Sequence, residues 1–229
     1  ITLSSNLSVD KMTYEGCSLG DISTEFVYIP QEDGSHYLDA VLFSEGSQVG
    51  SLIGTYHPAG KGVLNADLKL EHLPMKIVNG FIPQQLFGFE GYADGSMKVR
   101  GELSKPHVDG EVFLDSMYMV SVPYGVKLRF SDDPVRVVDS KLMLENFEVF
   151  GHNDNPLNIY GNINFADLDN VYMDVRMKAT NYQLINSKEN YRSVAYGKAY
   201  IDFYGSVRGK LDNLMMRGRL NVLGSTDVA

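Results

Sequence analysis

The chain has 229 residues, of which 44% are hydrophobic and 21% charged, and it contains no tryptophan. This composition excludes disordered and fibrous proteins and is typical of a globular chain that can bury a sizeable core. The formal net charge of −9 argues against nucleic acid as a partner, because a phosphate backbone would be repelled rather than neutralised. The sequence also has no run of about 20 apolar residues, the length that a membrane-spanning helix requires.

The dominant pattern is an alternation of apolar and polar residues, which in a strand sends successive side chains to opposite faces of a sheet. It first becomes regular over residues 62–71 and returns over residues 97–103. The apolar members of these runs include Leu68, Leu70, Met97, Val99 and Leu103. Because the other parity is polar or charged, we expect an antiparallel sheet with one apolar and one wet face.

One segment follows a helical period instead. Its apolar residues at helical spacing are Leu73, Ile77, Val78 and Phe81. Pro74 stands near the favoured first-turn position, so we expect a short amphipathic helix over residues 73–80. As a structural element this helix would cap one end of the core, and as a functional element it would be a lid in a groove.

The alternation continues in the C-terminal part of the chain, where turn signals such as Asn153-Asp154-Asn155-Pro156 separate the runs. The apolar residues of these runs are Val112, Leu114, Leu157, Ile159, Ile163, Phe165, Val171, Met173, Val175, Met177, Ile201, Phe203, Val207, Leu214, Met216, Leu220 and Val222. The parity changes between Leu144 and Phe147. One inserted residue would cause this change, so we expect a β-bulge near Glu145 and Asn146.

An internal repeat links two of these regions. The segment Val99-Arg100-Gly101-Glu102-Leu103 recurs as Val207-Arg208-Gly209-Lys210-Leu211, and the apolar positions that follow match at the same offsets. Such a repeat predicts equivalent strand-turn-strand units in an extended array. Glycines also occupy the apolar parity, at Gly101, Gly110, Gly161, Gly205 and Gly218. They either relieve crowding or let the sheet curl around a hollow.

The sequence predicts no catalytic residue, metal site or cofactor. Gly16-Cys17-Ser18-Leu19-Gly20 matches the nucleophile-elbow pattern, but its flanks are strand-like and no helix is expected to follow. The five histidines are isolated in sequence and lack the spacing of a zinc site. Cys17 is the single cysteine, so it cannot form an intrachain disulfide. We therefore do not expect an enzyme.

The order of elements from residue 73 to residue 114 resembles a known family. The helix is followed by Gly91-Tyr92-Ala93-Asp94-Gly95, by the strand-like run 97–103, by Pro106 and by a second run over 108–114. This order of glycine, strand, glycine, proline and strand is similar to the recurrent unit of the TamB family, the translocation and assembly module subunits of the AsmA-like superfamily. The resemblance is best over residues 60–115 and 170–223, although the second copy has no proline near Leu214.

The resemblance implies an elongated, strongly curled antiparallel sheet, a β-taco or open groove, that carries lipid acyl chains. Its function would be phospholipid transport between the inner and outer membranes in outer-membrane biogenesis. A competing role is a scaffold for assembly of outer-membrane proteins with an Omp85-family barrel, TamA-like in kind. A structural β-repeat or adhesin is a third alternative. The implied location is the periplasm, with the full-length protein anchored in the inner membrane by an N-terminal segment absent here.

We therefore expect residues 1–229 to form one elongated groove segment of a longer protein. It would comprise N-terminal strands over 1–60, a strand-helix-hairpin unit over 61–115 and further β-repeats over 116–229. The apolar residues named above, from Leu68 to Val222, are the candidate lipid-groove residues, and the helix is the candidate lid or cap. If Ile163 and Val175 line an open groove, an arginine at either position blocks transport and leaves the chain folded. Global unfolding would indicate a closed core instead.

Overall fold

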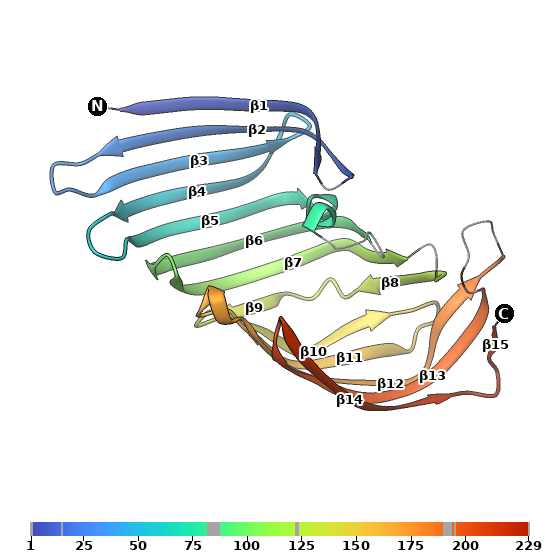
Figure 1. Ribbon diagram of the computed structural model, residues 1–229. Helices are drawn as coiled ribbons and strands as arrows, with labels where there is room; N and C mark the ends of the chain where they lie inside the picture. Colours follow the sequence, from blue (N-terminus) through green and yellow to red (C-terminus); the bar gives the residue numbers. More distant parts are fainter. Residues whose placement is uncertain are drawn as a thin grey trace.

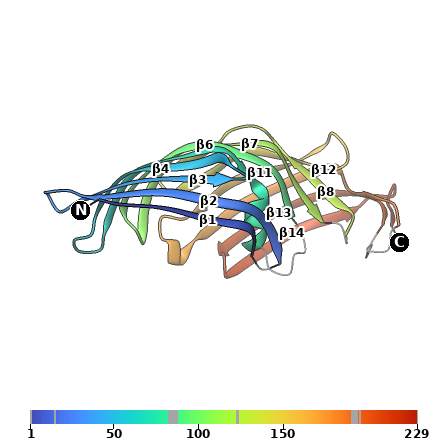
Figure 2. The ribbon, with the colours of Figure 1, turned by 90° about the horizontal axis from the view of Figure 1, so that it is seen from above.

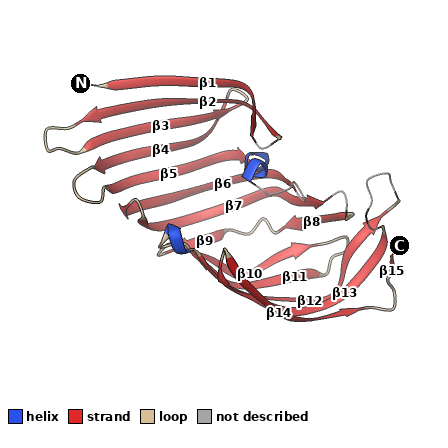
Figure 3. Cartoon of the chain, viewed as in Figure 1, coloured by secondary structure: helices blue, strands red, loops and turns tan. Residues whose placement is uncertain are grey.

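The computed structural model describes residues 2–14, 16–81, 88–121, 124–189, 194 and 196–228, except for the side chains of residues 78, 80 and 81. Figure 3 shows that most of these residues are in strands. The strands are β1 (Leu3–Tyr14), β2 (Cys17–Pro30), β3 (His36–Ser44), β4 (Ser47–His57), β5 (Val63–Pro74), β6 (Gly88–Glu102), β7 (Lys105–Ser121), β8 (Val126–Phe130), β9 (Val135–Val138), β10 (Lys141–Phe150), β11 (Pro156–Asn164), β12 (Tyr172–Ser187), β13 (Gly197–Lys210), β14 (Asn213–Val222) and β15 (Asp227–Val228). The 3-10 helices η1 (Met75–Phe81) and η3 (Leu168–Asn170) interrupt them.

All these strands belong to one 15-stranded sheet, in which consecutive strands pair except for β8 with β9 and β14 with β15. β8 and β9 both lie between β7 and β10, each pairing with a different stretch of them, and β15 pairs with β13. Every strand pair is antiparallel, as short hairpin connections require. The predicted all-β antiparallel sheet is therefore confirmed.

The sheet is strongly curled. β1 to β7 lie side by side in Figure 1, whereas β10 to β14 turn away from their direction. Seen from above in Figure 2, the strands form an arch. β8 also contacts β12, which is separated from it in the sheet by β10 and β11. The curl is therefore tight enough in this half to bring non-adjacent strands together.

The main core lies inside this curl. Its buried residues come from β8 to β13 and are Leu128, Val135, Phe147, Val149, Ala179, Tyr182 and Ile201. Leu114, Leu142, Leu157 and Phe203 pack against them. All these side chains lie on the same face of the sheet, which is therefore the inner face of the curl.

Bulges of one kind recur along the sheet and bend its strands. In β1, β5 and β12 two residues oppose a single aspartate of the next strand. The second bulge residue has a positive φ, and its N–H donates to that aspartate: Lys11 to Asp21 at 2.7 Å, His72 to Asp94 at 2.7 Å and Asn181 to Asp202 at 2.8 Å. The bulge predicted at Glu145 and Asn146 is confirmed in β10, where Tyr160 stands opposite. These bulges increase local bending and twist.

The internal repeat corresponds to two equivalent hairpins, β6–β7 and β13–β14. Val99 pairs with Val108 in the first, and Val207 pairs with Met216 in the second. A side chain would not fit at Gly161, one of the glycines on the apolar face. Its φ is +131°, and a Cβ there would overlap the carbonyl oxygen of Asp174 on β12. Close approach of neighbouring backbones therefore accounts for glycine at this position.

Ser140 ties the turn between β9 and β10 to β7. It is only 1% exposed. Its Oγ accepts the Val108 N–H at 2.8 Å and donates to the Pro106 carbonyl at 2.6 Å. Its own N–H donates to the Val108 carbonyl at 2.8 Å. The serine therefore completes the ladder where β9 ends.

We expect Ser140→Ala to lower the free energy of unfolding by about 1 to 3 kcal/mol, because the Val108 N–H loses its buried acceptor. Urea denaturation followed by far-UV circular dichroism measures this change. Ser104→Ala, in the exposed turn between β6 and β7, is the matched control and should change stability by less than about 0.5 kcal/mol. Equal effects of the two substitutions would contradict the assigned role of Ser140.

Candidate functional site

Register pairing joins the apolar side chains into rows that cross the whole inner face. One row runs through β2 to β14 as Phe26, Ala40, Leu52, Leu68, Met97, Gly110, Val137, Leu142, Ile163, Met173, Gly209 and Leu214. A parallel row in β10 to β14 contains Leu144, Gly161, Val175, Val207 and Met216. We call this surface the apolar face and the opposite surface the polar face. The apolar face is continuous from β2 to β14.

Most of the predicted groove residues share the apolar face. The structure brings together Leu68, Leu70, Met97, Val99, Val112, Leu114, Leu157, Ile159, Ile163, Met173, Val175, Met177, Ile201, Phe203, Val207, Leu214, Met216, Leu220 and Val222 on it. Leu103 lies instead in the turn between β6 and β7 and is 50% exposed. Phe165 follows the end of β11, and Val171 precedes β12, so neither is part of a strand.

The apolar face is closed over β8 to β13. Val149 is 3% exposed, Val175 5% and Ile201 9%. The aromatic rings of Phe89, Phe130 and Phe147 follow one another with centroids 6.2 and 5.9 Å apart. Side chains of β7 to β13 thus fill the space inside the curl. This part is a dry core, which packs densely and does not offer a free channel.

The same face is open over β2 to β6. Leu38, Leu52, Leu68, Leu70 and Met97 all remain partly exposed there. Buried residues of these strands include the small Ala66 and Ala93, each 4% exposed, and Leu19 and Val49 near one end, 4% and 3% exposed. These strands therefore present a trough of aliphatic side chains to solvent.

The segment predicted as a helical lid has a different structure. Leu73 and Pro74 are the last residues of β5, and a 3-10 helix, not an α-helix, begins at Met75. Pro74 fits because it ends the strand, opposite Tyr92. Ile77 is partly buried, whereas the Val78 and Phe81 side chains lie outside the described residues.

η1 closes one end of the open trough. It contacts both β2 and β6, and Figure 2 shows it on the inner side of the arch. Asn79 holds it against β6: its Nδ2 donates to the Phe89 carbonyl at 3.0 Å, and its Oδ1 accepts the Phe89 N–H at 2.6 Å. The position agrees with a cap at the end of the groove, and whether η1 opens as a lid stays a prediction.

The strongest apolar residues of β2 to β4 were absent from the predicted groove. Phe26, Leu38, Leu42 and Leu52 belong to its open half. Their strands lack a clean alternation, because the polar face also carries apolar residues such as Ile53. These residues could have been assigned to the apolar face from their cross-strand partners, counted back from β5, whose alternation is regular.

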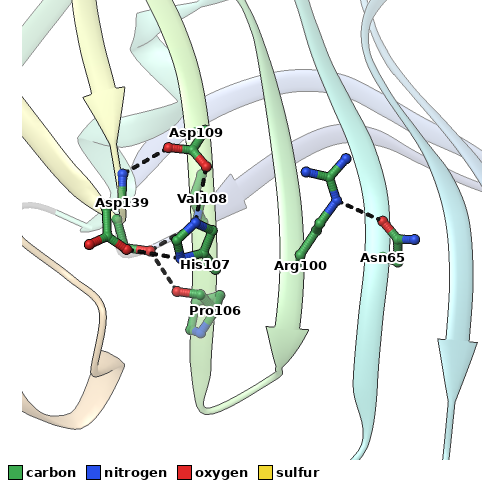
Figure 4. Close-up of polar contacts among 8 residues, drawn as sticks. Asn65, Arg100, Pro106, His107, Val108, Asp109 and Asp139 are labelled. Carbon is green, nitrogen blue, oxygen red and sulfur yellow. Dashed lines mark hydrogen bonds and ion pairs between the residues drawn. The ribbon is translucent and has the colours of Figure 1, made fainter.

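Cross-strand polar contacts organise the polar face. In Figure 4, His107 on β7 lies between two carboxylates, with its Nδ1 2.9 Å from Asp139 Oδ1 and its Nε2 3.2 Å from Asp109 Oδ2. Asp109 also accepts the Asp139 N–H at 2.8 Å, and Arg100 donates to Asn65 at 3.3 Å. These side chains are exposed and join neighbouring strands. They form a structural network beside Ser140.

A hollow of about 590 Å³ lies over β4 to β7. Most of its lining residues have polar-face parity, including Ile53, Asp67, Lys98 and Asp109. It therefore lies mainly on the outer side of the sheet and is distinct from the trough of the apolar face.

The nucleophile-elbow pattern of the sequence lies in a strand. The Cys17 to Gly20 stretch forms the start of β2, so the nucleophile-elbow pattern lacks the following helix that this motif requires. Within the described ranges, no three His, Cys, Asp or Glu side chains gather as metal ligands. None of the helices described there has the length and hydrophobicity to cross a membrane.

Comparison of the chain with protein-family models, with curated proteins and with solved structures finds no match. The functional assignment therefore depends on the geometry of the apolar face.

Tyr182 is a buried polar group inside the closed half. It is 2% exposed, and its hydroxyl has no hydrogen-bond partner among the described residues. Burial raises the pKa of this phenol well above its usual range. We expect Tyr182→Phe to raise the free energy of unfolding by about 1 kcal/mol, because it removes an unsatisfied hydroxyl. Thermal melting tests this, and a lower melting temperature would show that the hydroxyl has a stabilising partner.

We expect His152 to make the free energy of unfolding depend on pH. Burial, opposed by a backbone hydrogen bond to Gly125, lowers the pKa of this imidazole below its ordinary value of 6.5. On acidification the unfolded chain takes up this proton before the folded chain does, so the stabilisation present above pH 6.5 declines below it. We expect urea midpoints at pH 7.5 and 5.5 to differ less in His152→Phe than in the wild type. An unchanged difference would assign the acid sensitivity to other groups.

Proposed function

We propose that the open half of the apolar face binds the acyl chains of lipids and that the protein is a groove segment for lipid transport. The observation that carries this proposal is the row of partly exposed aliphatic side chains that crosses β2 to β6 in continuous register. Transfer of methylene groups from water to such a surface is worth about 0.8 kcal/mol each, so a 16-carbon chain gains on the order of 10 kcal/mol before ordering costs.

The closed half supports this role in a different way. Its packed core holds β8 to β13 in a fixed curl beside the open strands. Met97 lies in the central row of the open half. Its unbranched, polarisable side chain adapts to different tail shapes. The binding surface is thus carried on a rigid scaffold and needs no specific contact.

Transport between the inner and outer membranes, a periplasmic location and membership of the AsmA-like superfamily form part of this proposal. They come from the sequence resemblance described above. The strong curl and the equivalent β6–β7 and β13–β14 hairpins are in keeping with it.

The test is extraction of lipid from the purified protein. Native mass spectrometry of the folded chain should show bound species with the masses of phospholipids, and organic extraction should recover them. Refolding in lipid-free buffer followed by addition of palmitate should restore binding at one or a few sites. A protein that carries no lipid and binds no palmitate would overturn the proposal.

The edge strands favour a second candidate function, a scaffold for outer-membrane protein assembly. Among the described residues, β1 and β14 pair on one side only. Leu214, Met216, Leu220 and Val222 of β14 are between 43% and 68% exposed. An unpaired strand of this kind can add a strand from another protein.

A photo-crosslinking residue at position 217 on β14 tests the scaffold. Crosslinks from this position to an Omp85-family barrel, absent when the same residue replaces Arg100 in the middle of the sheet, would favour it. Equal labelling from both positions would argue against pairing at this edge.

A further inference from the structure

A pocket of about 440 Å³ opens at the end of the trough where η1 lies. It is bounded by the turn between β3 and β4, by η1 and by the beginning of β6. The ladder between β4 and β5 ends at the Gly50–Leu70 pair, so residues 47–49 and 72–74 diverge beyond it. The sheet is notched here. The volume is in the range of small-molecule sites.

The notch contains a buried polar group without a partner. Ser44 lines the pocket and is 3% exposed, yet its Oγ has no hydrogen-bond partner among the described residues. Ser44 pairs with Ile22 and lies two residues beyond Leu42, so it has the parity of the apolar face. Leaving a buried hydroxyl unpaired costs free energy. A ligand that supplies an acceptor would remove that cost.

Charged residues of both signs line the same pocket. Lys76 Nζ stands 3.5 Å from Glu45 Oε1, and both residues line the pocket. Glu90 lines it from the polar-face side, because it pairs with Tyr118, and it has no ion-pair partner among the described residues. A purely anionic ligand would meet two carboxylates and one ammonium group. A zwitterion satisfies both signs, with an anionic oxygen at Lys76 and Ser44 and a cation at Glu90.

The pocket also leads onto the apolar face. Phe89 and Val49 line it, and Phe89 packs against Phe130 at the margin of the core. A molecule whose polar end occupies the notch can thus extend an apolar tail along the trough. Such a molecule is amphipathic, with a compact head that carries both charges.

We propose that this notch is the headgroup site of a zwitterionic phospholipid, with a phosphate held by Lys76 and Ser44 and an ammonium group held by Glu90. The inference rests on the proposed function, because it takes the trough as the acyl-chain site. It adds selectivity: the trough accepts any tail, and the notch favours a phosphoethanolamine head over an anionic head.

Titration calorimetry of the folded 229-residue chain tests the assignment. The probes are short-chain phosphatidylethanolamine, phosphatidylglycerol with the same chains, palmitate and chain-free glycerophosphoethanolamine. We expect phosphatidylethanolamine to bind about tenfold more tightly than phosphatidylglycerol. Lys76→Gln and Glu90→Gln should each remove most of this preference. Ser44→Ala should weaken phosphatidylethanolamine binding about fivefold.

Lys61→Gln is the matched control, since Lys61 pairs with Glu102 away from the notch, and it should preserve the preference. Equal affinity of the wild type for both phospholipids, with palmitate still bound, would overturn the headgroup site alone. Binding of glycerophosphoethanolamine without palmitate would make the notch a site for soluble zwitterions and overturn the proposed function. Absence of binding for all four probes would overturn both.

Discussion

Val149→Arg is expected to unfold the protein or to lower its free energy of unfolding by more than about 3 kcal/mol. Val149 is 3% exposed and belongs to the core cluster of the closed half. The buried polar residues among the described part of the chain include no carboxylate, so a guanidinium placed there is unpaired, and an unpaired buried charge is strongly destabilising. This decrease is a large part of the total free energy of unfolding, which is roughly 5 to 15 kcal/mol for a typical domain.

Urea denaturation measures this effect against a control of equal charge. Asn158→Arg, next to Glu148 in register on the polar face, should change stability by less than about 0.5 kcal/mol. A Val149→Arg protein that melts like the wild type would show that the interior of the curl is wet. Because Val175 is only 5% exposed, we expect an arginine there to unfold the chain as well, and not to act as a block in an open groove.

Leu52→Arg is expected to abolish acyl-chain binding and leave the protein folded. Leu52 lies between Ala40 and Leu68 in the central row of the open half and is partly exposed. The arginine can therefore turn its head to water, so its folding cost stays within about 1 kcal/mol. A chain laid along the row would have to desolvate the guanidinium, which should weaken palmitate binding more than about tenfold.

Displacement of a fluorescent fatty acid measures the binding, and thermal melting checks the fold. The neighbouring substitution Ser51→Arg places the same charge on the polar face and should leave both unchanged. If Leu52→Arg binds palmitate normally, the trough over β2 to β6 is not the acyl-chain site. If both variants lose binding equally, the effect is one of net charge.

The sheet could be predicted where its two faces differ in polarity. In β5 the apolar Leu68 and Leu70 alternate with Asp67 and Lys69, so period two alone assigns each residue to its face. In β3 the sequence Val41-Leu42-Phe43 is apolar at every position. There the parity of a residue follows from its partners across the sheet, which a local pattern does not contain.

Closure of the groove could not be predicted from alternation. Period two shows which residues share a face but not whether other strands cover that face. Val99 and Ala179 both lie on the apolar parity of well-alternating strands, yet Ala179 is buried in the core cluster where the curl brings β8 against β12. This contact joins segments some 50 residues apart, so it depends on the accumulated bending of several strands and not on any one of them.

The predicted helix rests on four apolar residues at helical spacing, and the first of them belongs to a strand. Leu73 and Pro74 extend β5 past a bulge at His72, and only the residues after them turn into η1. The positive φ of His72 shifts the parity of the strand by one residue. That shift imitates the change from a strand period to a helical one.

In the recurrent bulge, an aspartate of the following strand accepts the N–H of the bulge residue. Because both partners lie in one hairpin, a sheet of this kind can be lengthened by adding whole hairpins. Each bulge and its aspartate lie within two consecutive strands, as in Lys11 with Asp21, His72 with Asp94 and Asn181 with Asp202. Duplication of such a pair copies its own bend and restores both strand direction and side-chain parity. Gene duplication could therefore lengthen the trough by about 10 Å per hairpin without redesign of the existing strands.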